Sequence, residues 1–101
     1  MPDEIHELVV IDTASEKLAA RDISDEEAEE LTDNRHVITP NRGRRRRSAR
    51  VMRNRRMLIG RTDGGRALTL VVERTIEPSS WLVITGWNSS KRERKMLAKK
   101  G

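Results

Sequence analysis

The sequence predicts an α+β fold in a single domain spanning residues 1–101. Segments with helix-capping residues stand near both ends of the chain, and β-prone segments joined by short turns lie between them. We therefore expect two N-terminal helices, an antiparallel meander sheet of three or four strands, and one C-terminal helix. Hydrophobic residues make up 35% of the chain, and because they occur in runs a thin core is expected.

The first third of the chain predicts the two N-terminal helices. Residues 5–11 (IHELVVI) form an apolar run that is too short for its periodicity to distinguish a strand from a helix. Residues 13–22 predict a helix with one apolar side. Residues 25–32 predict a second helix, because Ser24 and Glu27 have the spacing of a capping box, in which each side chain binds the other residue's backbone N–H.

The middle of the chain predicts strands. Residues 35–39 are β-prone, and residues 41–50 form a polar, arginine-dense loop. Residues 52–62 and 66–74 predict the two strands of a hairpin. The Asp63-Gly64-Gly65 segment between them favours a tight turn, because glycine accepts positive φ at no steric cost.

The C-terminal part predicts one more strand, residues 81–87, and a last helix, residues 91–99. Ser89 or Ser90 is expected to cap this helix. Within the preceding strands, Gly60 marks a place where another segment is expected to approach the backbone closely or where a bulge occurs.

Trp81 and Trp87 are the only aromatic residues of the chain. Their even spacing predicts that they share one face of a strand, and packing in the core is favoured over stacking on nucleic-acid bases. So few aromatic residues also argue against modules that stack several bases on a sheet.

Charge is distributed unevenly along the chain. Residues 1–33 carry twelve acidic and two basic side chains, whereas residues 34–101 carry four acidic and nineteen basic ones. Residues 42–56 contain nine arginines and no acid. Guanidinium groups match phosphate oxygens and stay charged, so binding to nucleic acid or another polyanion is expected. A solvated basic loop, or a loop neutralised by the acidic first third, are the alternatives.

Several classes of protein and site are excluded or not indicated. The chain has no cysteine, which excludes disulfides and thiolate metal sites. Its start lacks the pattern of a secretory signal, and no apolar run is long enough for a membrane span. No nucleotide-binding loop, zinc-binding helix motif or nucleophile elbow occurs. We expect a cytoplasmic protein with no membrane contact, no cofactor and no metal.

Three residues are candidates for catalysis on RNA. Arg61 and Arg66 flank the hairpin turn, where active-site placement and simple surface charge are both open. His36, next to the basic loop, could act as general base on a 2′-hydroxyl, although a structural or exposed position is the alternative. The RNA backbone is expected to contact the arginine cluster, which comprises Arg44, Arg45, Arg46, Arg47, Arg50, Arg53 and Arg56.

The hairpin and the segments after it resemble a known family. Residues 56–68, which contain the run IGRTDGGR, are followed by Ile84-Thr85 and by a capped helix with Arg92-Glu93-Arg94. This order is similar to that of BrnT-type toxins of bacterial toxin–antitoxin systems. Residues 23–28 (ISDEEA) resemble the family's G-[VI]-S-x-E-E-A segment.

The resemblance implies a compact α+β fold similar to that of RelE-type ribonucleases. It also implies toxic RNA cleavage and neutralisation by a small DNA-binding antitoxin, through which an oligomer is expected to form.

The leading hypothesis is therefore a metal-independent endoribonuclease toxin of a type II toxin–antitoxin system. The 2′-hydroxyl would attack the adjacent phosphorus while arginines stabilise charge on the phosphate oxygens. A nucleic-acid-binding protein without catalysis, and a basic interaction protein for an acidic partner, are the alternative functions.

Overall fold

The computed structural model describes residues 5–40 and 54–99, and it has the predicted α+β fold. The elements follow in the order β1 (Glu7–Val9), α1 (Asp12–Ala19), α2 (Asp25–Asp33), β2 (His36–Pro40), β3 (Arg55–Arg61), β4 (Ala67–Arg74), β5 (Ser80–Asn88) and α4 (Lys91–Lys99). The two N-terminal helices, the run of strands and the C-terminal helix are those expected from the sequence.

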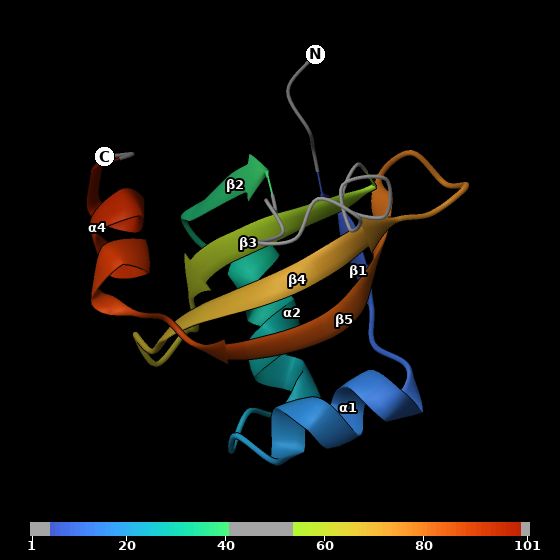
Figure 1. Cartoon of the computed structure of the whole chain (residues 1–101), viewed down its shortest axis with the longest axis horizontal. Helices are drawn as coiled ribbons and strands as arrows, with labels where there is room; N and C mark the ends of the chain where they lie inside the picture. The colour runs from blue at the N-terminus through green and yellow to red at the C-terminus, as the bar shows by residue number, and fades with distance from the viewer. Residues whose placement is uncertain (1–4, 41–53, 100–101) are drawn as a thin grey trace, which may run out of the picture.

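The strands form one five-stranded sheet with the order β1-β5-β4-β3-β2, which Figure 1 shows between α1, α2 and α4. Strands β2 to β5 pair antiparallel with their neighbours, as the meander prediction requires. The expectation of three or four antiparallel strands is wrong in one respect, because β1 adds a fifth strand that pairs parallel with β5. Residues 5–11 could not indicate this, since the strand has three residues and its partner begins at Ser80.

The two N-terminal helices cover one face of the sheet, here called the inner face. Its side chains alternate along the paired strands and include Leu58, Leu70 and Val72. They pack against buried side chains of the first part of the chain, among them Leu18, Ile23, Ala28 and Leu31. The opposite face, here called the outer face, carries Met57, Ile59, Thr69 and Val71.

Two strand glycines let the helices approach the inner face closely. A Cβ atom at Gly86 would lie 2.5 Å from Leu70 Cδ2 and 2.9 Å from Leu18 Cδ2, a side chain of α1. At Gly60 it would lie 3.1 Å from His36 Cβ and 3.3 Å from Leu31 Cβ, a side chain of α2. The predicted close approach at Gly60 is therefore confirmed, and the approaching side chains are His36 of β2 and Leu31 of α2.

The tryptophans lie on opposite faces of the sheet, so the prediction that they share a face is wrong. The register of β4 with β5 shifts between Val71 and Val72, whose partners are Thr85 and Val83. Ile84 is thus an extra residue in β5, and it reverses the alternation of side chains beyond it. Trp81 belongs to the core on the inner face, as expected, whereas Trp87 pairs with Thr69 on the outer face.

The predicted capping box and hairpin turn are both present. The Ser24 N–H donates to Glu27 Oε1 at 3.0 Å, and the Glu27 N–H donates to Ser24 Oγ at 3.1 Å. In the turn, Gly65 has a φ of 89° and its N–H donates to Thr62 O. The positive φ that the sequence predicted for this turn therefore occurs at Gly65, the second of its two glycines.

The last helix, α4, contacts β2 and β3 and stands at the end of the sheet away from the β4–β5 turn (Figure 1). Its one buried residue is Leu97. Across residues 5–40 and 54–99, every helix is too short or too polar to cross a membrane.

The packing at Gly86 predicts the effect of a single added methyl group. Gly86→Ala should lower the free energy of unfolding by about 1–3 kcal/mol, because the new Cβ overlaps two buried leucines and lies 3.0 Å from Thr69 O. Gly64→Ala is the matched control, since its Cβ would meet only Thr62 Oγ1 at 3.8 Å. Urea denaturation of the three proteins measures the difference, and equal stability of wild type and Gly86→Ala would contradict the packing.

Candidate nucleic-acid interface

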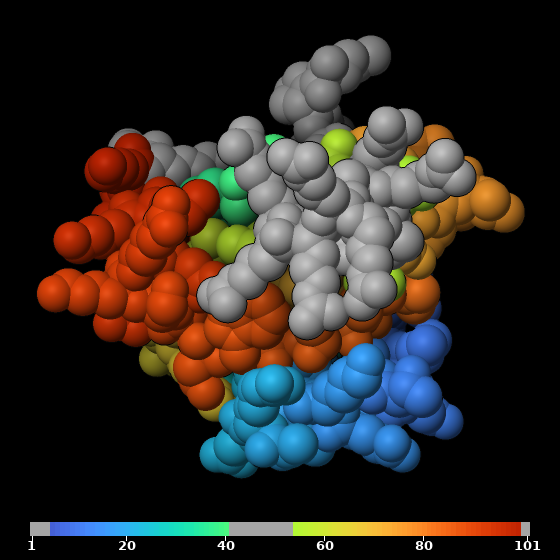
Figure 2. Space-filling view, in the orientation of Figure 1, coloured from blue at the N-terminus to red at the C-terminus, as the bar shows by residue number. Residues whose placement is uncertain are grey.

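In the described residues, the sheet lies between the two acidic N-terminal helices and the basic helix α4. Residues 5–33, which include α1 and α2, contain ten acidic and two basic side chains, and both helices lie on the inner face. Helix α4 carries one acid, Glu93, and five cations, which are Lys91, Arg92, Arg94, Lys95 and Lys99. Figure 2 shows the side chains of α4 and those of α1 on separate parts of the surface. Helix α1 therefore does not cover α4, and α2 packs on the opposite, inner face.

Glu93 anchors α4 to the outer face. Its Oε1 accepts the Ser90 N–H at 2.8 Å, the Thr69 hydroxyl at 3.0 Å and the Trp87 indole N–H at 3.1 Å. The Thr69 hydroxyl in turn bonds the Ser89 hydroxyl at 2.8 Å. Because Thr69 and Ser89 are buried, the carboxylate joins the first turn of the helix to polar groups in the sheet.

These contacts also set the protonation of Glu93. Burial disfavours the ionised carboxylate, but the hydrogen bonds from the Ser90 N–H, Trp87, Thr69 and the Ser90 hydroxyl outweigh it, so the pKa of Glu93 lies below its ordinary value of 4.5. The side chain is ionised at neutral pH. The Ser90 and Glu93 pair is a second capping box, since the Glu93 N–H also donates to Ser90 Oγ at 3.2 Å.

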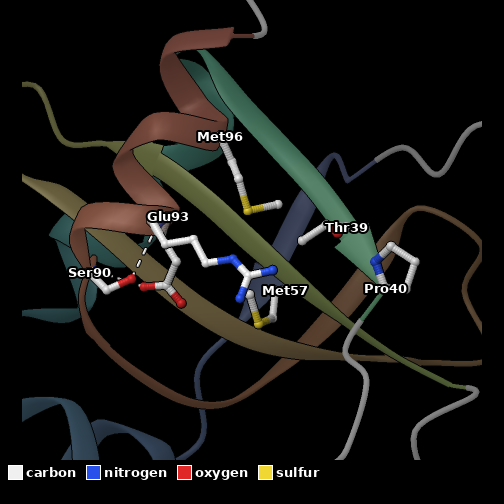
Figure 3. Close-up of a pocket in the computed structure, with 7 residues that line it drawn as sticks. Thr39, Pro40, Met57, Ser90, Glu93 and Met96 are labelled. Carbon is white, nitrogen blue, oxygen red and sulfur yellow. Dashed lines mark hydrogen bonds between the residues drawn. The ribbon is translucent and has the colours of Figure 1, made fainter.

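A groove runs between α4 and the outer face beside this anchor. It has a volume of about 530 Å³ and is lined by Thr39, Pro40, Met57, Ser90, Arg92, Glu93 and Met96. Figure 3 shows Met96 pointing from α4 toward the sheet and Met57 rising from β3, with Thr39 and Pro40 on the far wall. The groove thus has an apolar floor and a polar wall.

Arg61, one of the three predicted catalytic residues, is exposed beside a second hollow at the other end of α4. This hollow has a volume of about 280 Å³ and is lined by Arg35, Arg61, Leu97 and Ala98. Arg61 Nη1 donates to Gly65 O at 2.9 Å, and Arg35 Nη2 makes a long contact of 3.4 Å with Ala98 O. Two cations therefore face one hollow on the α4 side.

Arg66 instead ties the hairpin to the acidic layer. Its Nη1 donates to Asp22 O at 2.6 Å and to both oxygens of Glu27 at 3.2 Å. Its Nε donates to Asn88 Oδ1 at 2.9 Å, and its Nη2 donates to Arg21 O at 3.3 Å. Every guanidinium nitrogen of Arg66 thus contacts the fold itself.

The ion pair with Arg66 also affects Glu27. The hydrogen bond from the Ser24 N–H and the contacts with Arg66 lower the pKa of Glu27, although burial opposes the shift. Arg66 and the α2 capping box are therefore parts of one cluster.

His36 is half-buried on the inner face, where it pairs with Gly60. Its Nδ1 lies 2.7 Å from Asn34 O, which requires the tautomer protonated at Nδ1. Since neighbouring residues of a strand alternate between faces, His36 lies on the inner side and Arg61 on the outer side. Arg66, in the turn before β4, is held on the inner side by its bonds to Glu27 of α2. The structure does not bring the three predicted catalytic residues together.

Of the predicted RNA-binding arginines, Arg56 is described, and it lies on an inner-face position between Pro40 and Val72. The other predicted contacts lie outside the described residues: Arg44, Arg45, Arg46, Arg47, Arg50 and Arg53. Sequence reasoning did not single out Arg35, Glu93 or Met96. A signal existed for Glu93, because Ser90 and Glu93 have the spacing of a capping box.

No protein-family model and no curated protein matches this chain. In the part of the chain that the structure describes, no three His, Asp or Glu side chains are grouped so that they could hold a metal ion.

The contacts of Glu93 predict a pH-dependent contribution to stability. Since its pKa is lowered in the folded state, the contribution is complete above about pH 4.5 and is lost as the pH falls through the lowered pKa. Glu93→Gln should lower the free energy of unfolding by about 1–3 kcal/mol at neutral pH. The deficit should shrink as the pH falls through the lowered pKa, because the wild-type carboxylate then becomes protonated.

Urea denaturation at neutral pH and at an acid pH below the lowered pKa measures this deficit. Glu16→Gln, an exposed change on α1, is the control and should leave stability nearly unchanged. A deficit for Glu93→Gln that is equal at both pH values would contradict the proposed role of the ionised carboxylate.

Proposed function

We propose that the protein binds RNA on its α4 side and is the ribonuclease toxin of a type II toxin–antitoxin pair. The observation that carries the proposal is the separation of charge by the sheet, with the acidic helices on the inner face and the cations of α4 on the other side. A surface of one sign that is not covered by the other suits a polyanion. The cytoplasm is the expected place of action.

The binding surface consists of α4 and the adjoining outer face. Lys95 and Lys99 are exposed on α4, and Arg61 and Arg35 face the hollow at its end. In the described residues neither of these two guanidinium groups forms an ion pair. Such groups can exchange their counterions for phosphates, which favours binding through the release of those counterions.

The proposed reaction is cleavage without a metal ion. The 2′-hydroxyl attacks the adjacent phosphorus, and cations stabilise the charge that develops on the phosphate oxygens. Of the three residues predicted for this chemistry, Arg61 is the one on the α4 side, so it is the proposed stabilising cation. Arg66 and His36 are proposed to hold the fold, because their described contacts are with the backbone, with α2 and with Asn88 of β5.

A second candidate function is RNA binding without cleavage. It is favoured by the same arrangement, because neither His36 nor Arg66 accompanies Arg61 on the outer side. In both cases a small antitoxin with an acidic segment would neutralise the protein by covering the α4 side, and an oligomer would form through that antitoxin.

Removing cations from α4 should weaken RNA binding in a salt-dependent way. For Lys95→Gln/Lys99→Gln, the slope of log K against log salt should become shallower by about 1.4, which corresponds to two contacts with a single strand. Lys17→Gln/Arg21→Gln removes two cations from the inner-face layer and should leave the slope unchanged. Fluorescence anisotropy with a labelled RNA measures both, and equal slopes for the two variants would exclude α4 as the contact surface.

Cleavage and structure should depend on different arginines. When the protein is incubated with RNA in the presence of EDTA, Arg61→Ala should cleave the RNA about 10²-fold more slowly than wild type if Arg61 contacts the transition state. Arg66→Ala should instead lower the free energy of unfolding by about 1–3 kcal/mol, since it removes hydrogen bonds to Glu27, Asn88 and the backbone. Equal cleavage by wild type and Arg61→Ala would remove Arg61 from the mechanism, and binding without any cleavage would favour the second candidate.

A further inference from the structure

We propose that the groove between α4 and the outer face is a nucleobase-binding site. One base of a single-stranded RNA lies between Met57 and Met96, while the neighbouring phosphates lie along Arg92, Lys95 and Lys99. The inference rests on the proposed RNA binding and names the part of the RNA that this site accepts.

The groove has the size and the lining of a site for a flat organic ring. Its volume of about 530 Å³ falls within the range of small-molecule sites, roughly 300–1,000 Å³. Met57 and Met96 are half-buried and line it together with Pro40. Thioether sulfur is polarisable and makes favourable contacts with aromatic rings, so the two methionines form a slot that suits a base.

Neither tryptophan is among the described residues that line the groove. Trp81 lies in the inner-face core, and the Trp87 indole N–H is bound to Glu93. The chain has no Phe or Tyr. A base that enters the α4 side can therefore make its apolar contacts with the methionine slot.

The helix places a row of cations along the rim of the groove. Arg92 and Met96 are four residues apart and both line the groove, so they lie on the same side of α4. Lys95 and Lys99, at three and seven residues from Arg92, fall on this side as well. All three cations are exposed, and the row is about 10 Å long at the helical rise per residue.

The polar wall suits the edge of a base. The Glu93 carboxylate is held by Ser90, Thr69 and Trp87 through Oε1, whereas Oε2 has one long contact of 3.4 Å with the Trp87 indole. Thr39 and Ser90 add hydroxyl groups to the lining. These few polar groups on a mainly apolar slot resemble the lining of sites that bind bases and cofactors.

Charge favours a nucleotide over a protein segment as the occupant. A nucleotide carries an apolar ring and an anion side by side, and the groove offers a methionine slot beside a row of cations. An acidic peptide would match the cations alone. An acidic peptide is the competing occupant, and it predicts no preference for RNA over a strand without bases.

The test compares two strands of equal length and charge, a short single-stranded RNA and a strand with abasic riboses. Wild-type protein should bind the RNA more tightly than the abasic strand. Met96→Gln should weaken RNA binding about fivefold, the lower end of what removal of one base-stacking side chain costs, and should leave binding to the abasic strand unchanged. Met57→Gln, from the facing strand, should give the same result.

Two controls separate the slot from general effects. Met96→Leu keeps the apolar contact and should bind RNA nearly as wild type does. Ile76→Gln replaces a residue that is 99% exposed in the β4–β5 turn, outside the groove, and should change neither affinity. Urea denaturation of each variant shows that it is folded at the temperature of the binding assay.

Two results would overturn the proposal in distinguishable ways. If wild type binds RNA and the abasic strand equally, and both glutamine variants do the same, the phosphates alone are bound and the groove is left to a peptide or to no ligand. If wild type binds neither strand, the proposed function itself fails, and the base site fails with it.

Discussion

The packing of α1 and α2 onto the inner face is the constraint on which the other features depend. Leu18 and Leu31 are buried, and they reach the sheet where Gly86 and Gly60 leave room for them. Because the acidic side chains belong to the same two helices, burying their apolar sides places the negative charge on one side of the sheet. Helix α4 lies against β2 and β3, and the acidic helices α1 and α2 do not cover its cations. The charge separation is thus a consequence of how the core is filled.

Arg61 and Arg66 flank the same turn but have different surroundings. Arg61 and Arg66 are five positions apart, and the turn between them places one side chain on each face. Arg66 meets the capping box of α2 and is held by Glu27, Asp22 and Asn88. Arg61 meets the end of α4 and stays exposed. This difference in surroundings is the reason why a stabilising role is proposed for Arg66 and a ligand-binding role for Arg61.

Glu93 links the fold to the proposed site. A carboxylate inside a row of cations would weaken binding to phosphate if it were free, but its hydrogen bonds to Ser90, Thr69 and Trp87 hold it against the sheet. It therefore sets the position of α4 relative to Met57 and thereby the width of the groove. The same residue gives the α4 side a stability that depends on pH.

The sequence by itself determined the three helices, the meander of β2 to β5, the hairpin turn over residues 63–65 and the capping box at Ser24, because each depends on contacts between near neighbours. It also determined the uneven charge along the chain. It could not indicate that β1 pairs parallel with β5, since that partner is distant in the sequence and the strand is short.

Only the tertiary structure decided which side chains meet. The extra residue Ile84 places Trp87 on the opposite face of the sheet from Trp81. The alternation of side chains along β2 and β3 places His36 and Arg61 on opposite faces, and Arg66 bonds α2 on the inner side. The groove at Met57 and Met96 requires α4 to be placed on a strand that lies far away in the sequence. Local propensity specifies each segment, whereas the register of the sheet and the packing of its helices specify every site made from several segments.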